Sequence, residues 1–249
     1  MILVKDLSFS YNDKDVLKDL NFSINEKERV LLLGINGSGK STLLKILNGL
    51  IFPNKGKYLY KDEEITEKSL KSKDFQRKFR KEVVLLFQNP DIMLFNPTCY
   101  DEIAFGLKQL NLNGIDEKVK FWAEKVGISK YLKEAPFNLS GGEKQKLCLA
   151  SLLVLEPEFL LLDEPTANLD PKSTGWFIDF LNELQITALI AIHNLNLATE
   201  MGKRAIVLSE EHKIIYDGNL KEFLKNKEKL KEANMLHVHK DKDFHLHFW

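Results

Sequence analysis

The sequence predicts an α/β fold built on a mainly parallel sheet, and two observations carry this prediction. Short apolar runs alternate along the chain with stretches of helical periodicity, which is typical of parallel strands joined by helices. The apolar run 30–33 leads directly into a glycine-rich segment, residues 34–42, and then into a helical stretch. Strand, glycine-rich turn and helix in this order form the setting of a phosphate-binding loop.

The expected elements follow from the same patterns. An opening strand runs from residue 2 to a turn near residue 11, and with the strand 21–24 it predicts an antiparallel N-terminal β portion. The strands expected in the core are 29–33, 83–87, 159–162, 188–192 and a closing pair, 205–209 and 214–216. The helices expected are 42–48, 116–126, 143–155, 173–184 and 220–234, with a solvated loop and helix at 61–81.

The distribution of strands along the chain predicts its domain organisation. No convincing strand pattern appears in residues 90–155, which indicates a helical subdomain inserted into the core. We therefore expect a single domain, residues 1–236, whose core comprises residues 1–89 and 156–224. The remaining residues, 237–249, form a histidine-rich tail of distinct composition.

Composition argues against a nucleic-acid-binding protein, a secreted disulfide-bonded protein and a membrane-spanning protein. Lysine plus arginine and aspartate plus glutamate each number 36 among 249 residues, so the chain is neutral and no nucleic-acid partner is expected. Cys99 and Cys148 form no CxxC motif, and we expect both to be reduced and structural. The first six residues lack the plan of a signal peptide, and the longest apolar run, 147–155, is too short to span a bilayer. We expect a cytosolic chain that reaches a membrane only through a partner.

The glycine-rich segment suits the binding of a nucleotide's phosphates. Glycines let the backbone close around an anion, so that successive N–H groups and those of the helix start point at phosphate oxygens. Lys40 is placed to neutralise the terminal phosphates, and the Ser41 hydroxyl to ligate Mg²⁺. The alternative is an ordinary glycine-rich turn. The nucleotide-binding residues expected here are Asn36, Gly37, Ser38, Gly39, Lys40, Ser41 and Thr42.

A second motif is an apolar strand that ends in two adjacent acids, Asp163 and Glu164, followed by Pro165. In a nucleotide site the carboxyl end of a strand faces the ligand. Asp163 is then expected to hold the Mg²⁺ shell, and Glu164 to polarise the water that attacks the γ-phosphate. The alternative is a core strand that ends in a polar turn.

A third motif, residues 139–145, is another helix start that contains two glycines. Ser140 and Glu143 have the spacing of a capping box, which by itself explains a stable helix start. A capped helix start is also an anion site, but this one has no lysine or metal ligand of its own. We therefore expect it to supplement another phosphate site.

These motifs, in this order, resemble those of the ATP-binding cassette (ABC) ATPases, the nucleotide-binding subunits of ABC transporters, over residues 2–235. The resemblance implies a P-loop NTPase fold with a RecA-like core, and ATP and Mg²⁺ as ligands. Residues 168–170 resemble the family's D-loop. The roles that the resemblance implies are adenine stacking by Tyr11, phosphate binding by Lys40, Mg²⁺ ligation by Ser41, Gln88 and Asp163, general base catalysis by Glu164, and positioning of the γ-phosphate and attacking water by His193.

The resemblance also explains the second helix start. In the family, two subunits pack head to tail, and each ATP lies between one phosphate loop and the other subunit's signature residues, which here are Ser140, Gly141 and Gly142. The implied partner is a second copy of this chain or a paralogous ABC ATPase. Binding and hydrolysis of ATP then form a two-state switch.

A narrower resemblance, to the energy-coupling factor (ECF) ATPases, lies in residues 87–91, 95–98 and 101–106. Those ATPases drive the uptake of cobalt, nickel or vitamins. The resemblance implies a transmembrane coupling subunit, whose helix docks in a groove formed after Gln88, and a substrate-binding membrane subunit. It places the chain at the cytoplasmic face of the membrane.

Two departures from the family's pattern stand out. The signature carries Glu143 and Lys146 where glutamine and arginine are more common, and the charge of Glu143 would slow hydrolysis if it lies near the partner's phosphates. The tail histidines have i, i+2 spacing, which suits a transition-metal site on an extended segment, whereas the alternative is a polar tail or a docking strand. The metal ligands expected for such a site are His237, His239, His245 and His247.

Two other functions remain open at this point. One is a soluble ABC ATPase of DNA repair or of the ribosome, although such proteins usually carry coiled-coil insertions or two cassettes, which this chain lacks. The other is a metal-sensing ATPase in which the histidine-rich tail binds the metal.

Overall fold

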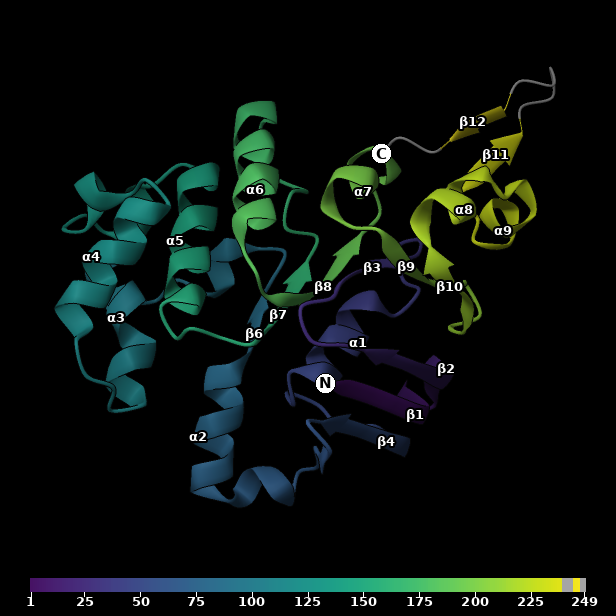
Figure 1. Ribbon diagram of the computed structural model, residues 1–249, viewed down its shortest axis with the longest axis horizontal. Helices are drawn as coiled ribbons and strands as arrows, with labels where there is room; N and C mark the ends of the chain where they lie inside the picture. The colour runs from purple at the N-terminus through teal and green to yellow at the C-terminus, as the bar shows by residue number, and fades with distance from the viewer. Residues whose placement is uncertain (239–243, 247–249) are drawn as a thin grey trace.

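The core of the molecule is a six-stranded sheet with strand order β10-β9-β3-β8-β7-β6, seen in the computed structural model of Figure 1, which describes residues 1–238 and 244–246. All neighbouring strands are parallel except β10, which pairs antiparallel with β9. The α/β prediction is therefore confirmed. The bounds are β3 Arg29–Leu33, β6 Val83–Leu86, β7 Phe159–Asp163, β8 Thr187–Ile192, β9 Arg204–Leu208 and β10 Ile214–Asn219.

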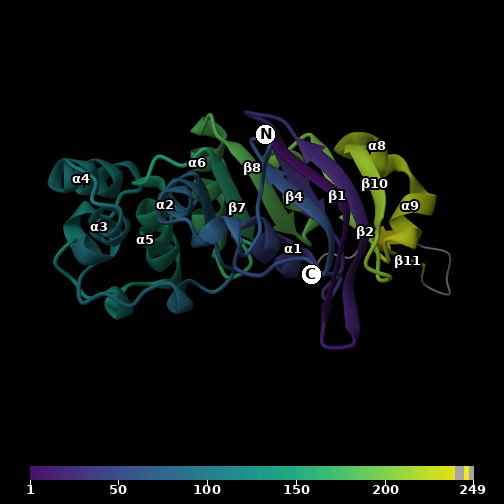
Figure 2. The ribbon, with the colours of Figure 1, turned by 90° about the horizontal axis from the view of Figure 1, so that it is seen from below.

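The N-terminal β portion is a second, antiparallel sheet with order β2-β1-β4-β5 (Figure 2). Its strands are β1 Ile2–Tyr11, β2 Lys14–Ile24, β4 Lys55–Tyr60 and β5 Glu63–Glu64. The expected strand 21–24 was too short, and β4 and β5 were not expected. The reason is solvent exposure on one face: buried and exposed residues alternate along the second half of β2, and the first half of β4 is exposed, so polar residues hide the strand pattern.

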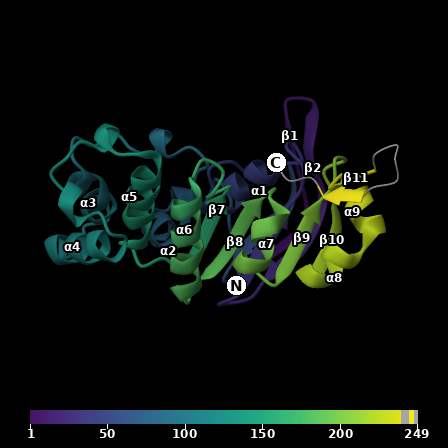
Figure 3. The same ribbon diagram turned by 90° about the horizontal axis from the view of Figure 1, so that it is seen from above.

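Two hydrophobic cores lie on opposite faces of the parallel sheet. Side chains of β3 alternate between them, because Leu31 and Leu33 belong to one core while Val30 and Leu32 belong to the other. Helix α1 fills the second core between the two sheets, whereas α6 and α7 cover the other face (Figures 2 and 3). These helices are α1 Lys40–Leu47, α6 Pro171–Glu183 and α7 Leu195–Met201.

A separate helical lobe stands beside the sheet, at the left of Figure 3. Its α-helices are α3 Cys99–Gln109, α4 Ile115–Lys125 and α5 Gly141–Leu153. A 3-10 turn at Pro90–Ile92 precedes α3, and two more, Ser129–Tyr131 and Pro136–Asn138, lie between α4 and α5. Before it, the turn Ser69–Lys71 and helix α2, Lys73–Glu82, lead into β6. In the described part of the chain, none of the helices is both long enough and apolar enough to cross a membrane.

The prediction of one C-terminal helix over residues 220–234 is wrong, because the chain forms two short helices there, α8 Leu220–Lys225 and α9 Lys227–Glu232. Asn226 causes the break: its backbone is extended, and its side chain accepts the N–H of Lys229 and so caps α9.

The strands β11, Leu236–Val238, and β12, Phe244–Leu246, then pair antiparallel, with His237 opposite His245. The expected metal ligands His239 and His247 lie outside the described residues. Among residues 1–238 and 244–246, no group of three or more metal-binding side chains gathers in one place.

Candidate active site

One cavity of about 470 Å³ gathers the motifs that lie far apart in the sequence. The phosphate loop follows β3, Gln88 follows β6, Glu164 follows β7 and His193 follows β8, so all of them leave the carboxyl edge of the parallel sheet. The residues that line the cavity are Val16, Asn36, Gly37, Gly39, Lys40, Ser41, Thr42, Gln88, Glu164 and His193.

Two glycines of the loop adopt a backbone conformation that side chains rarely allow. Gly37 and Gly39 have φ values of 85° and 106°, in the left-handed region. A Cβ at Gly39 would also lie 2.5 Å from the carbonyl oxygen of Val16, so the loop packs directly against β2. The close turn delivers the start of α1, with its free N–H groups, to the cavity.

Lys40 extends back along the loop that precedes it. Its Nζ donates to the carbonyl oxygens of Gly34 at 2.8 Å and Ile35 at 3.2 Å, and it lies 3.5 Å from Oε1 of Glu164. The side chain is only 5% exposed. Burial lowers the pKa of Lys40, and the nearby Glu164 carboxylate opposes that shift. The cavity therefore holds a cation that is poorly solvated and suited to an anionic ligand.

Glu164 is the point at which three other motifs meet. Its carboxylate accepts from Nε2 of Gln88 at 3.4 Å and lies 2.8 Å from Nδ1 of His193, in addition to its contact with Lys40. Its backbone N–H donates to Ala191 of β8, and its φ of 45° is unusual for a residue with a side chain. The chain thus holds this acid in a strained conformation at the cavity wall.

Asp163 ends β7 beside Glu164, does not line the cavity, and carries a buried oxygen without a partner in the described structure. Its Oδ1 makes no hydrogen bond among the described residues, and the residue is 6% exposed. Burial raises the pKa of Asp163, while a hydrogen bond from the Ser41 hydroxyl opposes the shift. An unpaired carboxylate oxygen beside a hydroxyl fits the oxygen ligand set that Mg²⁺ prefers.

The signature residues do not line this cavity. Ser140 and Glu143 form the predicted capping box, because Ser140 N–H donates to the Glu143 carboxylate at 2.9 Å and the Ser140 hydroxyl accepts from the Glu143 N–H. The space beside Gly142 is taken by the Ser173 hydroxyl, 2.5 Å from where a Cβ would stand. Ser173 in turn donates to Asp170, which caps α6. The start of α5 is therefore packed against the start of α6.

No sequence pattern singles out Tyr131 as a functional residue. Its hydroxyl donates to the Glu143 carboxylate, which also accepts from Ser140. These bonds lower the pKa of Glu143 to about 2. The carboxylate is therefore ionised at neutral pH and is turned toward its own helix start.

Two other expected nucleotide-binding residues stand apart from the cavity lining. Tyr11 is 45% exposed and packs edge-on against Phe9, with ring centroids 4.8 Å apart. Ser38 is 1% exposed, and its hydroxyl has no partner among the described residues. Val16 lines the cavity instead, and its position in β2 carries no sequence signal for such a role.

The loop that follows Gln88 is held by backbone hydrogen bonds to a buried carboxylate, and it exposes large apolar side chains. The buried Glu102 carboxylate accepts the backbone N–H groups of Phe95 and Asn96 at 3.0 and 2.7 Å. Ile92 and Phe95 are each 65% exposed, and Phe95 packs edge-on against the half-exposed Phe105. A rigid loop with large exposed apolar side chains is typical of a protein interaction site.

Comparison with known proteins gives consistent results. The profile of the family described as ABC transporter matches residues 17–167. The chain is 41% identical over 253 residues to a putative ABC transporter ATP-binding protein of Methanosarcina acetivorans, covering 98% of this chain and 90% of the relative. It is 38% identical over 241 residues to the energy-coupling factor transporter ATP-binding protein EcfA of Methanothermobacter thermautotrophicus, covering 94% and 76%.

A solved structure gives the same picture. The chain resembles cbiO1 of Clostridium perfringens, described as part of the ABC transporter complex cbiONQ, with a TM-score of 0.79 and 32% identity over 94% of each chain.

Proposed function

Because the chain belongs to the ABC transporter family of ATPases, we propose that it is the ATP-hydrolysing subunit of an ECF-type importer for cobalt, nickel or a vitamin. The observation that carries the site assignment is the convergence of Lys40, Gln88 and His193 on the carboxylate of Glu164. These four side chains come from four separate strand ends and line one cavity beside the phosphate loop.

Lys40 and the loop bind the phosphates of ATP in this proposal. The contacts of Lys40 with Gly34, Ile35 and Glu164 keep its ammonium group at the cavity wall. When a triphosphate enters, its oxygens supply a stronger counter-charge than neutral carbonyls. The N–H groups at the start of α1 bind the same phosphates without any change in their direction.

Ser41, Gln88 and Asp163 are the residues that would hold Mg²⁺. Asp163 contributes a buried, unpaired oxygen and Ser41 a hydroxyl next to it. The ion would neutralise charge on the phosphate oxygens during the transfer. Its presence would also oppose the upward shift that burial causes in the pKa of Asp163, because a divalent cation favours the carboxylate.

Glu164 acts as the general base and His193 as its neighbour that orients the γ-phosphate and the attacking water. The carboxylate already lies within 3.5 Å of the lysine that binds the phosphates. Catalysis then consists of positioning and charge stabilisation, and no covalent intermediate forms on the protein.

A second subunit completes the site. The signature residues Ser140, Gly141 and Gly142 do not line the cavity beside the phosphate loop of their own chain. They present a capped helix start, which is suited to an anion supplied from outside. We propose that two cassettes, either two copies or this chain and a paralogue, enclose ATP between one phosphate loop and the other signature.

The exposed side chains Ile92, Phe95 and Phe105 support a membrane partner. Ile92 and Phe95 lie in the loop that follows Gln88, and Phe105 on α3 packs against Phe95, so a coupling helix bound there would act on the residue that contacts Glu164. The chain then works at the cytoplasmic face of the membrane, held there by a transmembrane coupling subunit. A separate membrane subunit selects the solute.

Copurification tests this assignment. The tagged chain, extracted from membranes in mild detergent, is expected to bring with it integral membrane proteins, and the variant Phe95→Asp is expected to lose them while it still binds ATP. Phe121→Asp, which alters a similarly exposed phenylalanine on α4, is the matched control. Recovery of ribosomes or DNA in place of membrane proteins would replace the importer with a soluble ABC ATPase.

A further inference from the structure

Helix α2 carries a row of three cations along one side. Lys73, Arg77 and Lys81 follow one another at i, i+4 spacing, which places them along one side of the helix. Lys73 and Arg77 are exposed and Lys81 is half-buried. None of the three forms an ion pair within residues 1–238 and 244–246. We call these three residues the α2 cation row.

This arrangement works against the helix that carries it. Like charges at i, i+4 spacing destabilise a helix, and here they occur twice in succession. Residues 68–81 contain seven lysines and arginines and one acid, Asp74, although the whole chain is neutral. The acids Asp62, Glu63 and Glu64 belong to the neighbouring β4–β5 hairpin and make no ion pair with α2 in the described structure. An external anion would relieve this repulsion.

The opposite side of α2 fixes the row in place. Phe75 and Phe79 also have i, i+4 spacing, and Phe79 is 1% exposed in the core between the sheets. Each lies two positions, or about 200°, from the nearest cation of the row, so the apolar side faces the protein and the cations face outward. The row is therefore held on a packed helix and spans about 12 Å in a straight line.

Helix α2 lies next to the exposed segment around Leu50, on the side of the molecule away from the C-terminal helices. Arg80 donates to the carbonyl oxygens of Asn48 at 2.6 Å and Gly49 at 3.1 Å, directly before Leu50, which is 46% exposed. Figure 1 shows α2 at the lower edge, on the opposite side from α7, α8 and β11. After α2, strand β6 leads to Gln88 and the exposed loop with Ile92 and Phe95.

We propose that the α2 cation row binds the anionic headgroups of the membrane in which the importer stands. This rests on the proposed function, because docking of the loop after Gln88 on a membrane subunit would bring α2 close to the bilayer. A straight row of outward cations matches a flat anionic surface, and each such charge near it strengthens binding. The row would add an electrostatic anchor to the apolar contact with the partner.

Vesicle flotation of the purified full-length chain tests this inference without any membrane partner. The wild-type chain is expected to bind vesicles that contain about one third phosphatidylglycerol and to dissociate from them at high salt. It is expected not to bind vesicles of pure phosphatidylcholine. In the variant K73E/R77E/K81E, the vesicle partition coefficient is expected to fall at least about a hundredfold. The matched control K213E/K221E/K225E changes the net charge equally, on exposed lysines of the C-terminal part, and is expected to bind like the wild type.

Three results would overturn the inference. The first is vesicle binding that persists at high salt, and the second is an equal loss of binding in the control variant. The third is a wild-type chain that does not bind anionic vesicles but binds RNA in a gel-shift measurement. An unchanged ATPase rate of K73E/R77E/K81E in solution shows that the variant is folded. The proposed function fails separately, because copurification with membrane proteins depends on Phe95 and not on the α2 cation row.

Discussion

The imidazole of His193 and the carboxylate of Glu164 meet across two neighbouring parallel strands, with Nδ1 2.8 Å from Oε2. The backbone supports this contact, because the N–H of Glu164 donates to the carbonyl oxygen of Ala191, two residues before the histidine. Any displacement of the segment after β8 therefore changes the surroundings of the acid. The pair joins the proposed base to the residue that is proposed to hold the γ-phosphate.

The variant Glu164→Gln is expected to bind ATP and to lose turnover by about 10²–10⁴-fold, because the amide cannot accept a proton from water. Without hydrolysis the ATP-bound pair should persist, and light scattering should report twice the mass of the apo chain. Glu183→Gln, an exposed acid at the end of α6, is the control and should turn over normally. A Glu164→Gln protein that stays monomeric at saturating ATP would contradict the proposed two-subunit site.

Lys40→Ala is expected to weaken ATP binding by about 2–5 kcal/mol, because the phosphates would enter a buried site with their main cation removed. Lys45→Ala, a half-buried lysine on the same helix, should bind ATP like the wild type. Nucleotide titration calorimetry measures both. Unchanged affinity in Lys40→Ala would show that the phosphate loop is assigned wrongly.

Features that depend on neighbouring residues could be predicted from the sequence, whereas contacts between distant segments could not. Each motif lay within one strand–loop–helix unit, and because parallel strands share a carboxyl edge, the meeting of Lys40 and Glu164 followed from their positions. The hydrogen bond from Tyr131 to Glu143 joins a turn to a later helix, and no local pattern predicts it. The break at Asn226 was missed because a capping side chain outweighed a continuous helical composition.

Glu143→Gln tests whether the unusual acid of the signature slows hydrolysis. Glutamine satisfies the same capping box and should keep the fold, but the melting temperature should fall modestly because the hydroxyls of Tyr131 and Ser140 lose their charged acceptor. The ionised carboxylate, although turned toward Ser140 and Tyr131, still repels an approaching phosphate. We expect turnover to rise about two- to fivefold, in keeping with about 0.5–1 kcal/mol for a solvent-screened charge. An equal or lower rate would show that the charge of Glu143 is not felt at the partner's ATP.

Tyr131→Phe is expected to change how the protein responds to acid. The hydrogen bonds of Glu143 hold its pKa near 2 instead of 4.5, so their stabilisation is complete above about pH 4.5 and is lost as the pH falls toward 2. Without the tyrosine hydroxyl the pKa of Glu143 in the folded protein rises, so the loss of stability still begins near pH 4.5 but is smaller and is complete at a higher pH. Melting temperatures between pH 2 and 5 measure the shift.

The matched variant Tyr216→Phe removes a hydroxyl that donates to the Asn219 carbonyl and not to an acid. It should leave the pH profile unchanged. Identical acid profiles for the wild type and Tyr131→Phe would mean that Tyr131 does not set the pKa of Glu143.

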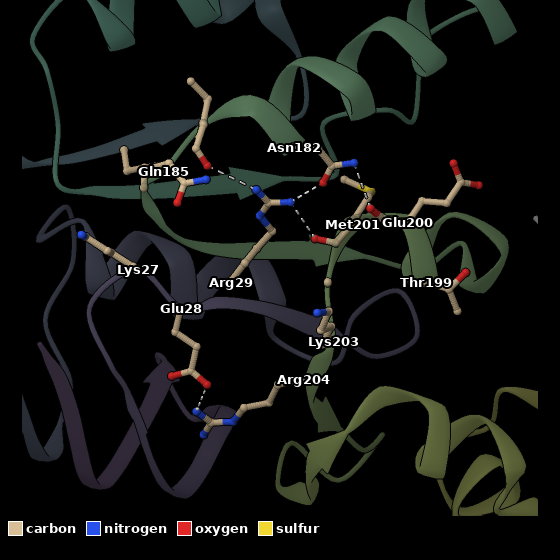
Figure 4. Close-up of a pocket in the computed structure, with 13 residues that line it drawn as sticks. Lys27, Glu28, Arg29, Asn182, Gln185, Thr199, Glu200, Met201, Lys203 and Arg204 are labelled. Carbon is tan, nitrogen blue, oxygen red and sulfur yellow. Dashed lines mark hydrogen bonds and ion pairs between the residues drawn. The ribbon is translucent and has the colours of Figure 1, made fainter.

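Arg29→Met is expected to lower stability without affecting ATP binding. Figure 4 shows the Arg29 guanidinium at a cavity of about 460 Å³, where it donates to Asn182 Oδ1 at 2.5 Å and to the carbonyl oxygen of Leu181 at 2.6 Å. A longer bond reaches the carbonyl of Met201. The arginine therefore ties the amino end of β3 to the ends of α6 and α7, at the edge of the sheet opposite the phosphate loop.

Removing this side chain leaves buried carbonyl oxygens without a donor, at a cost of about 2–3 kcal/mol. For a chain of this size that corresponds to a fall of about 4–12 °C in melting temperature. Lys27→Met alters an exposed cation at the same cavity that makes no ion pair in the described structure, and it should melt like the wild type. If Arg29→Met weakened ATP binding while its stability held, the two edges of the sheet would be coupled, and the purely structural role of Arg29 would be wrong.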